Sequence, residues 1–314
     1  MTDKPAPPIA RATTALMASP YFLLVLCSLI WGGNTVAGKL AVGNVDPYLL
    51  MILRWAGAFL LVLPFAIAPL RRDWRKIVAK WWLYLFYGAV GFGTFNALVY
   101  IAAHHTTGFN LGLDQVTINI FVMALSFAFF RTRVRALQLV GVAITIVGVA
   151  LTASHGDLSR LLALDINFGD WLMFAASFAY AAYSITLRWR PQTDWRSFLA
   201  VTFLGATLAS VVFAASAPGS LAAAAAAIPQ TTPLGWAIAA YAITLPSIVA
   251  QMFYVRGVEM IGPNRASLFI NLIPLFGALG AVLILGEILE AYHFTAAGLV
   301  ITGIVLAEWS ARRA

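Results

Sequence analysis

The sequence predicts an all-α integral membrane protein, with ten transmembrane helices arranged as a 5+5 inverted-repeat bundle. Hydrophobic residues make up 61% of the 314 residues and charged residues only 10%, a balance that does not suit a water-soluble domain. The hydrophobic residues gather in ten runs of about 20 residues, the length that an α-helix needs to cross a bilayer. The basic residues gather in alternate connections between these runs.

The ten expected helices follow one another with connections of mostly a few residues. They are predicted at 21–43, 47–70, 81–103, 109–130, 135–153, 168–187, 195–216, 234–256, 265–286 and 292–310. We divide the chain into an N-terminal cytoplasmic tail (1–20), a first five-helix unit (21–153) and a second five-helix unit (168–310). Because each unit has an odd number of spans, the second is inverted relative to the first, as in many secondary transporters.

Charge in the connections predicts how the chain is oriented. If the N-terminus is cytoplasmic, 17 of the 20 basic residues lie on the cytoplasmic face, the exceptions being Lys39, Arg54 and Arg160. Basic residues are enriched in cytoplasmic loops, so both termini are expected in the cytoplasm. The same rim of basic residues explains the net charge of +8. We expect no nucleic-acid partner, because no soluble domain carries a basic stripe with stacking aromatic residues.

Metal and cofactor chemistry is not expected. Cys27 is the only cysteine, so neither an intramolecular disulfide nor a cysteine-based metal site can form. His104 and His105 stand together, but no cysteine or acidic residue accompanies them at metal-ligand spacing. The first apolar run is too long for the core of a cleavable signal peptide, so we expect it to be the first span.

The two five-helix units share a weak internal repeat. Shifting the chain against itself by 154 residues pairs Tyr100 with Tyr254, Gly108 with Gly262 and Asn110 with Asn264. A shift of 149 residues pairs Trp31 with Tyr180, Asn34 with Tyr183 and Lys39 with Arg188. In inverted-repeat carriers the substrate site lies near the midplane between the repeats, often beside interrupted helices.

Three predicted spans contain residues that disturb an α-helix. Pro246 lies in the eighth span, Pro274 in the ninth, and Gly91 and Gly93 lie at the corresponding depth of the third. A proline removes a backbone donor and frees a carbonyl, which inside a membrane must be satisfied by protein or by cavity water. These positions are expected to form either part of a site or packing kinks.

Two motifs resemble a known family. Residues 262–287, GPNRASLFINLIPLFGALGAVLILGE, and residues 28–39, SLIWGGNTVAGK, with Arg54 and Trp55 after them, resemble the EamA branch of the drug/metabolite transporter (DMT) superfamily. The resemblance implies a central cavity lined by spans 1, 3, 4, 6, 8 and 9, in a bacterial inner-membrane carrier that commonly exports amino acids or other metabolites. The first half departs from the pattern, because it lacks a counterpart of Pro274 and has Arg131 or Arg133 where Glu287 would repeat.

Three ionisable residues are predicted inside spans, where charge is costly and marks functional candidates by default. These gating or coupling candidates are Lys39, Arg54 and Asp114, all in the outer half of the membrane. We expect them to compensate one another, because unpaired charges are unfavourable there. They form a static ion network, an outer gate, or a site where Lys39 or Arg54 attracts a substrate carboxylate. Asp114 is the only acidic residue well within a predicted span, which makes it the candidate for proton coupling.

Aromatic and amide residues form the second candidate set. They fall toward the interior of spans 1, 3, 6, 8 and 9, where polar side chains need partners or a wet cavity. The predicted substrate-binding residues are Trp31, Asn34, Asn96, Tyr100, Tyr180, Tyr183, Gln251, Tyr254 and Asn271. Such a surface offers ring faces and hydrogen bonds with little net charge, which suits a small amphipathic solute. For each residue alone, interhelical packing is the competing explanation.

Together these features predict a secondary transporter of a small organic metabolite that works by alternating access, with efflux of amino acids or related solutes as the leading prediction. An importer or exchanger of another metabolite fits the same features. A lipid-modifying membrane enzyme is disfavoured because there is no HExxH motif or phosphate-cradling glycine loop, and a channel because no repeated ring of selectivity groups is found. The expected partners are the bilayer, a small-molecule substrate and protons, with the protein a monomer or a homodimer.

Overall fold

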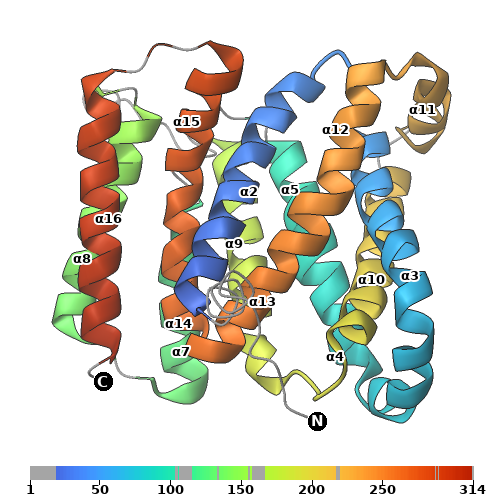
Figure 1. The fold of residues 1–314 in the computed structure, drawn as a ribbon, viewed down its shortest axis with the longest axis horizontal. Coiled ribbons are helices and arrows are strands. Elements are labelled where there is room, and N and C mark those ends of the chain that lie inside the picture. The colour runs from blue at the N-terminus through green and yellow to red at the C-terminus, as the bar shows by residue number, and fades with distance from the viewer. Residues whose placement is uncertain are drawn as a thin grey trace, which may run out of the picture.

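The computed structural model describes residues 19–102, 105, 115–132, 134–154, 156–157, 167–216, 220–286, 288 and 290–312. Within these residues every regular element is a helix, and the long helices stand side by side in one bundle (Figure 1). α2 (Pro20–Ala41) begins, and α16 (Ala291–Arg312) ends, at the same end of this bundle.

Helix occurs in each of the ten expected ranges. The first unit continues from α2 with α3 (Pro47–Ala79), α4 (Trp81–Phe86), η1 (Tyr87–Thr94), α5 (Phe95–Ala102), α7 (Thr117–Phe130) and α8 (Ala136–Ala153). The second unit begins with α9 (Phe168–Thr186), η3 (Leu187–Trp189), α10 (Trp195–Ser216), α11 (Ser220–Ala227) and η4 (Ile228–Gln230). It ends with α12 (Pro233–Thr244), η5 (Leu245–Val249), α13 (Ala250–Ile261), α14 (Pro263–Ala266), η6 (Ser267–Leu272), α15 (Ile273–Leu285) and α16.

Seven helical segments are long and apolar enough to cross a membrane. They are Pro20–Ala41, Pro47–Ala79, Trp81–Val99, Trp195–Ser216, Pro233–Ile261, Pro263–Leu285 and Ala291–Ala311. Thr117–Phe130 and Ala136–Leu151 are apolar but shorter. α9 has 19 residues but includes Asp170 and two tyrosines, and it is not among the seven. A multi-span helical bundle is therefore clear, with seven of the ten predicted spans meeting both criteria.

Local sequence sets where the long helices begin. Ser19, Asp46 and Thr232 stand before α2, α3 and α12, and each side chain accepts a hydrogen bond from a first-turn amide. A proline occupies the following position in all three helices, where its missing N–H costs nothing. α9 begins with a capping box between Asn167 and Asp170. Each capped start fixes the point at which the chain turns back into the bundle.

The predicted helix interruptions are confirmed. Gly91 and Gly93 lie in η1, a π-helical segment, and Pro246 lies in η5, a second π-helical segment. Pro274 is the second residue of α15, which follows directly on η6, a 3₁₀-helix. The glycines also admit close neighbours, since a Cβ on Gly91 would lie 2.5 Å from Cγ of Tyr183. Spans 3 and 8 therefore leave α-helical geometry in their middle, and span 9 leaves it in its first half.

Contacts between the two units hold the bundle together. α3 packs along α10, and α8 packs along α16. α2 packs against α13 and α15, while α9 packs against α5 and α7. The α8–α16 contact is close because Gly141 and Gly303 face each other: a Cβ on Gly303 would lie 2.5 Å from the carbonyl oxygen of Gly141.

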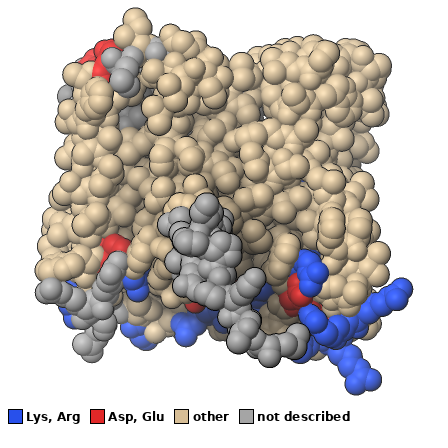
Figure 2. Space-filling view, viewed as in Figure 1, with Lys and Arg blue, Asp and Glu red and all other residues tan. Residues whose placement is uncertain are grey.

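Basic residues gather at one end of the bundle, which we call the basic end. It is formed by the α3–α4, α7–α8, α9–α10 and α13–α14 connections. On the face shown in Figure 2, lysines and arginines cluster along this end and are absent from the opposite one. Five tryptophans are each 45–61% exposed, as is typical of side chains at a membrane interface: Trp81, Trp82, Trp189, Trp195 and Trp309.

Candidate functional site

Arg54 lies at the centre of the candidate site. It sits on α3, two turns from its start, and only 4% of its surface is exposed. Its Nε donates to Oγ of Ser247 at 2.8 Å, and its Nη1 donates to Oδ1 of Asn96 at 3.2 Å. The guanidinium carbon lies 4.9 Å from the ring centroid of Trp55. Within the described part of the chain no carboxylate contacts Arg54, so a buried cation is held by neutral groups.

Backbone carbonyls of the two π-helical segments accept hydrogen bonds from predicted site residues. The carbonyl of Pro246 in η5 accepts a hydrogen bond from Nε1 of Trp31 at 3.1 Å. The carbonyl of Phe92 in η1 accepts one from Nδ2 of Asn96 at 2.8 Å. A π-turn alters the α-helical hydrogen-bond pattern, and inside a membrane every backbone carbonyl needs a partner. Two predicted site residues, Trp31 and Asn96, provide such partners.

Four of the predicted aromatic residues form one cluster. Trp31 on α2 lies with its ring centroid 6.1 Å from that of Tyr180 and 5.5 Å from that of Tyr254. Tyr180 on α9 is 5.6 Å from Tyr254 and 5.3 Å from Tyr183. The three tyrosines are buried, and the Tyr254 hydroxyl is 3.0 Å from Oγ of Ser184. α2, α9 and α13 thus meet through packed rings rather than around an open space in this conformation.

Buried amides near the cluster leave polar atoms unsatisfied. Nδ2 of Asn119 on α7 donates to Oδ1 of Asn271 on η6 at 2.7 Å, while the other polar atom of each amide has no partner among the described residues. Oε1 of Gln251 and the hydroxyl of Tyr183 are likewise buried without a hydrogen bond. A buried polar atom without a partner costs about 1–3 kcal/mol. Such atoms suit an interior that receives water or a polar solute.

Asn119 was not among the predicted site residues. A signal for it exists, because it stands in the run Ile–Asn–Ile of the first unit, as Asn271 stands in Ile–Asn–Leu of the second. A comparison of the two units at a shift of 152 residues pairs them.

The remaining candidates are placed only in part. Asn34 is half-buried and makes no hydrogen bond with the described residues, and Lys39 is exposed in the last turn of α2. The backbone of Tyr100 belongs to α5, whereas its side chain and all of Asp114 lie outside the described residues. Because Asp114 lies outside the described residues, the structure does not test the expected cluster of Lys39, Arg54 and Asp114.

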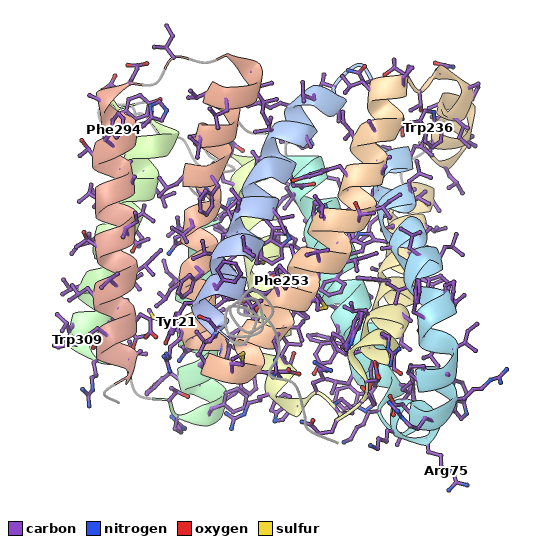
Figure 3. The ribbon with its side chains drawn as sticks, in the orientation of Figure 1. Tyr21, Arg75, Trp236, Phe253, Phe294 and Trp309 are labelled. Carbon is purple, nitrogen blue, oxygen red and sulfur yellow. The ribbon has the colours of Figure 1, made fainter. Side chains whose placement is uncertain are left out.

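Glu308 was missed by the sequence analysis, which took Asp114 as the only acidic residue well within a span. It lies near the end of α16 with 5% of its surface exposed. The hydroxyl of Tyr21 and Nη2 of Arg265 both donate to its Oε1, and Nε of Arg265 donates to its Oε2 at 3.2 Å. Figure 3 shows Tyr21 and Trp309 at the basic end of α2 and α16. A buried ion pair therefore joins α14 to α16.

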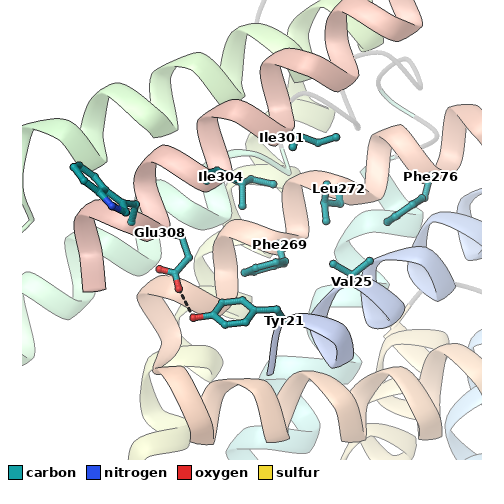
Figure 4. A pocket seen from close by; sticks show the side chains of 10 residues that line it. Tyr21, Val25, Phe269, Leu272, Phe276, Ile301, Ile304 and Glu308 are labelled. Carbon is teal, nitrogen blue, oxygen red and sulfur yellow. Dashed lines mark hydrogen bonds between the residues drawn. The ribbon is translucent and has the colours of Figure 1, made fainter. Parts of the chain in front are cut away.

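A side cavity opens next to this ion pair. It has a volume of about 530 Å³ and lies between α2, α15 and α16, with η6 at its base (Figure 4). Its lining is almost entirely apolar, and it consists of Tyr21, Val25, Phe269, Leu272, Phe276, Ile301, Ile304, Val305, Glu308 and Trp309. None of the predicted site residues lines it. Three of its residues, Ile301, Val305 and Trp309, are 45–61% exposed on the side of the bundle, so the cavity opens laterally.

At the basic end, polar contacts tie the two units together. Oδ2 of Asp73 on α3 accepts hydrogen bonds from the Asp194 amide at 2.8 Å and from the Ser197 hydroxyl at 2.9 Å. Arg72 reaches Asp194 at 3.2 Å. The Arg196 guanidinium also donates to Asp194 and holds the pKa of that carboxyl well below its usual range. These contacts join α3 to the start of α10 at the basic end.

The described residues contain no group of three or more histidine, cysteine, aspartate or glutamate side chains that could hold a metal ion.

Comparisons with known proteins agree on one family. The EamA-like transporter family matches this chain twice, at residues 18–154 and 167–309. The uncharacterized transporter YyaM of Bacillus subtilis (strain 168) is 24% identical over 296 residues, which cover 92% of this chain and 93% of that protein. An uncharacterized transporter of Archaeoglobus fulgidus is 28% identical over 289 residues, covering 90% and 94%.

A solved structure has the same fold. A crystal structure superposes with a TM-score of 0.70 at 16% identity, covering 94% of this chain and 98% of the other. The two family matches occupy most of the chain, and the long apolar helices fit a multi-pass membrane protein. The chain therefore belongs to the EamA-like transporter family, within the drug/metabolite transporter superfamily.

Proposed function

We propose that this protein is a secondary transporter that moves a small organic metabolite across the bacterial inner membrane by alternating access. We expect the direction to be efflux and the substrates to be amino acids or related solutes. One observation carries the proposal: spans 3 and 8 each contain a π-helical segment, and Arg54 bridges Ser247 in η5 and Asn96, two residues after η1, while Trp31 donates to the Pro246 carbonyl. Interrupted helices at equivalent places of two repeats are where secondary carriers bind their substrates.

The helix contacts support an inverted repeat of five spans in each unit. If α2 to α8 contain spans 1 to 5 and α9 to α16 contain spans 6 to 10, then α3–α10 joins spans 2 and 7 and α8–α16 joins spans 5 and 10. The contacts of span 1 with spans 8 and 9 correspond to those of span 6 with spans 3 and 4. Exchanging the two units thus reproduces the same set of contacts. This is the pattern expected when two equivalent units pack about a two-fold axis in the membrane plane.

The aromatic and amide residues supply the proposed binding surface. Trp31, Tyr180 and Tyr254 provide ring faces, while Gln251 and Tyr183 carry buried polar atoms without partners among the described residues. We propose that the rings separate and the polar atoms bind solute when the basic end opens. The basic end is taken as cytoplasmic, because lysines and arginines concentrate there.

The direct test is transport in proteoliposomes with a panel of labelled amino acids and other metabolites, with and without an imposed pH gradient. Exchange or uptake of at least one panel member is expected, and orientation-sorted vesicles then separate efflux from import. If the gradient drives transport and Asp114→Asn abolishes that stimulation, Asp114 couples protons. A carrier that moves no panel member under any gradient contradicts the proposal.

Trp31 gives a sharper test of the site itself. Trp31→Ala removes two ring contacts and leaves the Pro246 carbonyl unpaired, so transport should fall by roughly tenfold. Trp82→Ala is the matched control, because Trp82 is 52% exposed at the basic end. Initial rates in vesicles, normalised to folded protein, measure both variants. Equal rates for the wild type and Trp31→Ala would remove Trp31 from the site.

A further inference from the structure

We infer that Arg54 binds a carboxylate of the transported solute, so that the substrates of this carrier are organic acids or zwitterions and not neutral or purely cationic molecules. The inference rests on the proposed function and names its substrate class. It starts from the charge of Arg54, which is 4% exposed in a membrane-spanning helix and has no acidic partner within the described ranges.

The neighbours of Arg54 hold it in place without neutralising it. Ser247 accepts from Nε of Arg54 and donates its own hydrogen to the carbonyl of Ala242 at 2.8 Å. Asn96 accepts from Nη1 and donates to Phe92 at 2.8 Å. Both partners are uncharged, and each is itself anchored to the backbone: Asn96 to Phe92 in η1, and Ser247, which lies in η5, to Ala242 in the last turn of α12. The guanidinium is therefore fixed in direction but keeps its full charge.

Trp55 fixes the plane of the guanidinium from a further side. Its ring lies 4.9 Å from the guanidinium carbon and stacks on Phe92 at 5.2 Å with an interplanar angle of 9°. A guanidinium has five N–H donors, and the hydrogen bonds to Ser247 and Asn96 engage Nε and Nη1. Nη2 has no hydrogen bond in the described part of the chain. A planar, immobilised cation with unused donors is the arrangement that recognises carboxylates.

The position of Arg54 links this recognition to movement. Arg54 belongs to the first unit, and Ser247 belongs to the π-helical segment of the second. A carboxylate that takes over donors of Arg54 competes with Ser247 and Asn96 for them. Binding of an acid at Arg54 would therefore weaken a bond between the two units at the point where both helices are already interrupted.

The first experiment compares solutes that share a phenylethyl skeleton and differ in whether they carry a carboxylate. Thermal stabilisation of the purified protein in detergent is measured with L-phenylalanine, 3-phenylpropionate, L-phenylalaninamide and phenethylamine, and the same four compete in vesicle exchange. The two carboxylates should bind at least about tenfold more tightly than the amide and the amine. Equal stabilisation by all four, or by none, overturns the inference.

The second experiment gives Arg54 an internal carboxylate. Asn96→Asp places an acid where Asn96 Oδ1 now lies, 3.2 Å from Nη1, and should weaken carboxylate binding by about tenfold while the melting temperature stays equal or rises. Arg54→Gln should lose the preference for acids, Arg54→Lys should keep part of it, and Arg256→Gln, a 61% exposed control, should leave it unchanged. Undiminished acid binding in Asn96→Asp overturns the role of Arg54.

The role of Arg54 and the transport function can be contradicted separately. A wild type that transports acids, amides and amines equally remains a carrier, but the assignment of Arg54 is then wrong. A wild type that is stabilised by carboxylates through Arg54 but transports nothing keeps the binding site and contradicts the proposed function.

Discussion

At the scale of single residues, Arg265, which is partly buried, and Arg54, which is buried, have different chemistry. Arg265 meets a carboxylate, Glu308, and a hydroxyl, Tyr21, so its charge is balanced within the chain. Among the described residues, Arg54 contacts only a hydroxyl, an amide and an indole ring. Balanced charge holds helices together, whereas unbalanced charge in a membrane needs an external partner. The first arrangement is structural, and the second belongs to the proposed site.

We predict that Glu308→Gln destabilises the protein without changing which solutes it accepts. The substitution keeps the shape of the side chain but leaves Arg265 without its anion, which should cost about 2–4 kcal/mol. The melting temperature in detergent should fall. Glu290→Gln is the control, because Glu290 is an exposed carboxylate before α16. A variant as stable as the wild type would show that the ion pair contributes nothing to folding.

Sequence reasoning placed Trp31, Tyr180 and Tyr254 at similar depth on three spans, and their rings are in contact, while their role in binding solute stays a prediction. It could not find the partners of Arg54, because Ser247 is a small residue whose importance comes from a contact 193 positions away. Glu308 was missed for a related reason. An acid at the end of an apolar run suggests a solvated rim, and only the packing of α14 against α16 buries it.

At the scale of elements, proline and glycine were the informative residues. Pro246 and the pair Gly91 and Gly93 predicted interruptions in spans 8 and 3, and both spans contain a π-helical segment there. The type of interruption was not predictable, because a missing N–H or Cβ permits a π-turn, a 3₁₀-turn or a kink alike. The packing of neighbouring helices determines which of these three geometries forms. At η1, α10 lies so close that a Cβ on Gly88 would be 2.1 Å from the Thr202 carbonyl oxygen.

A prediction at this scale concerns the α8–α16 pair. Gly303→Ala would put a Cβ 2.3 Å from Thr145 Oγ1 and 2.5 Å from the Gly141 carbonyl, so the helices must separate at a cost of about 1–3 kcal/mol. Gly298→Ala, on the same helix, meets nothing within 4 Å and should be neutral or slightly stabilising. Melting temperatures of the two variants measure the difference. Equal melting temperatures would mean that this contact is loose.

At the scale of the whole molecule, the distribution of charge gives the proposed orientation. Arg75 and Trp236 mark opposite ends of the bundle (Figure 3), and Arg75 belongs to the basic end. The sequence alone predicted this separation, since charge in the connections needs no tertiary information. It did not predict the hydrogen bond between Asp73 and the Asp194 amide, because that contact joins the two units.

The orientation is tested with two introduced cysteines in a Cys27→Ser background. Arg75→Cys should react with a membrane-impermeant thiol reagent only after the cells are permeabilised, because the basic end is proposed to face the cytoplasm. Gln230→Cys, exposed on η4 before α12, should react in intact cells. The opposite labelling pattern would contradict the proposed orientation.

The two π-turns have one further consequence. A π-turn accommodates one residue more than an α-turn, and the extra residue can shift along the helix without altering where the helix begins or ends. Each such shift of register rotates the intervening side chains by about 100° around the helix axis. Spans 3 and 8 can thereby present different side chains to the interior while their ends keep their depth in the bilayer. Local rotation of these two spans offers a route for exchanging solute contacts that is separate from movement of the two units as rigid bodies.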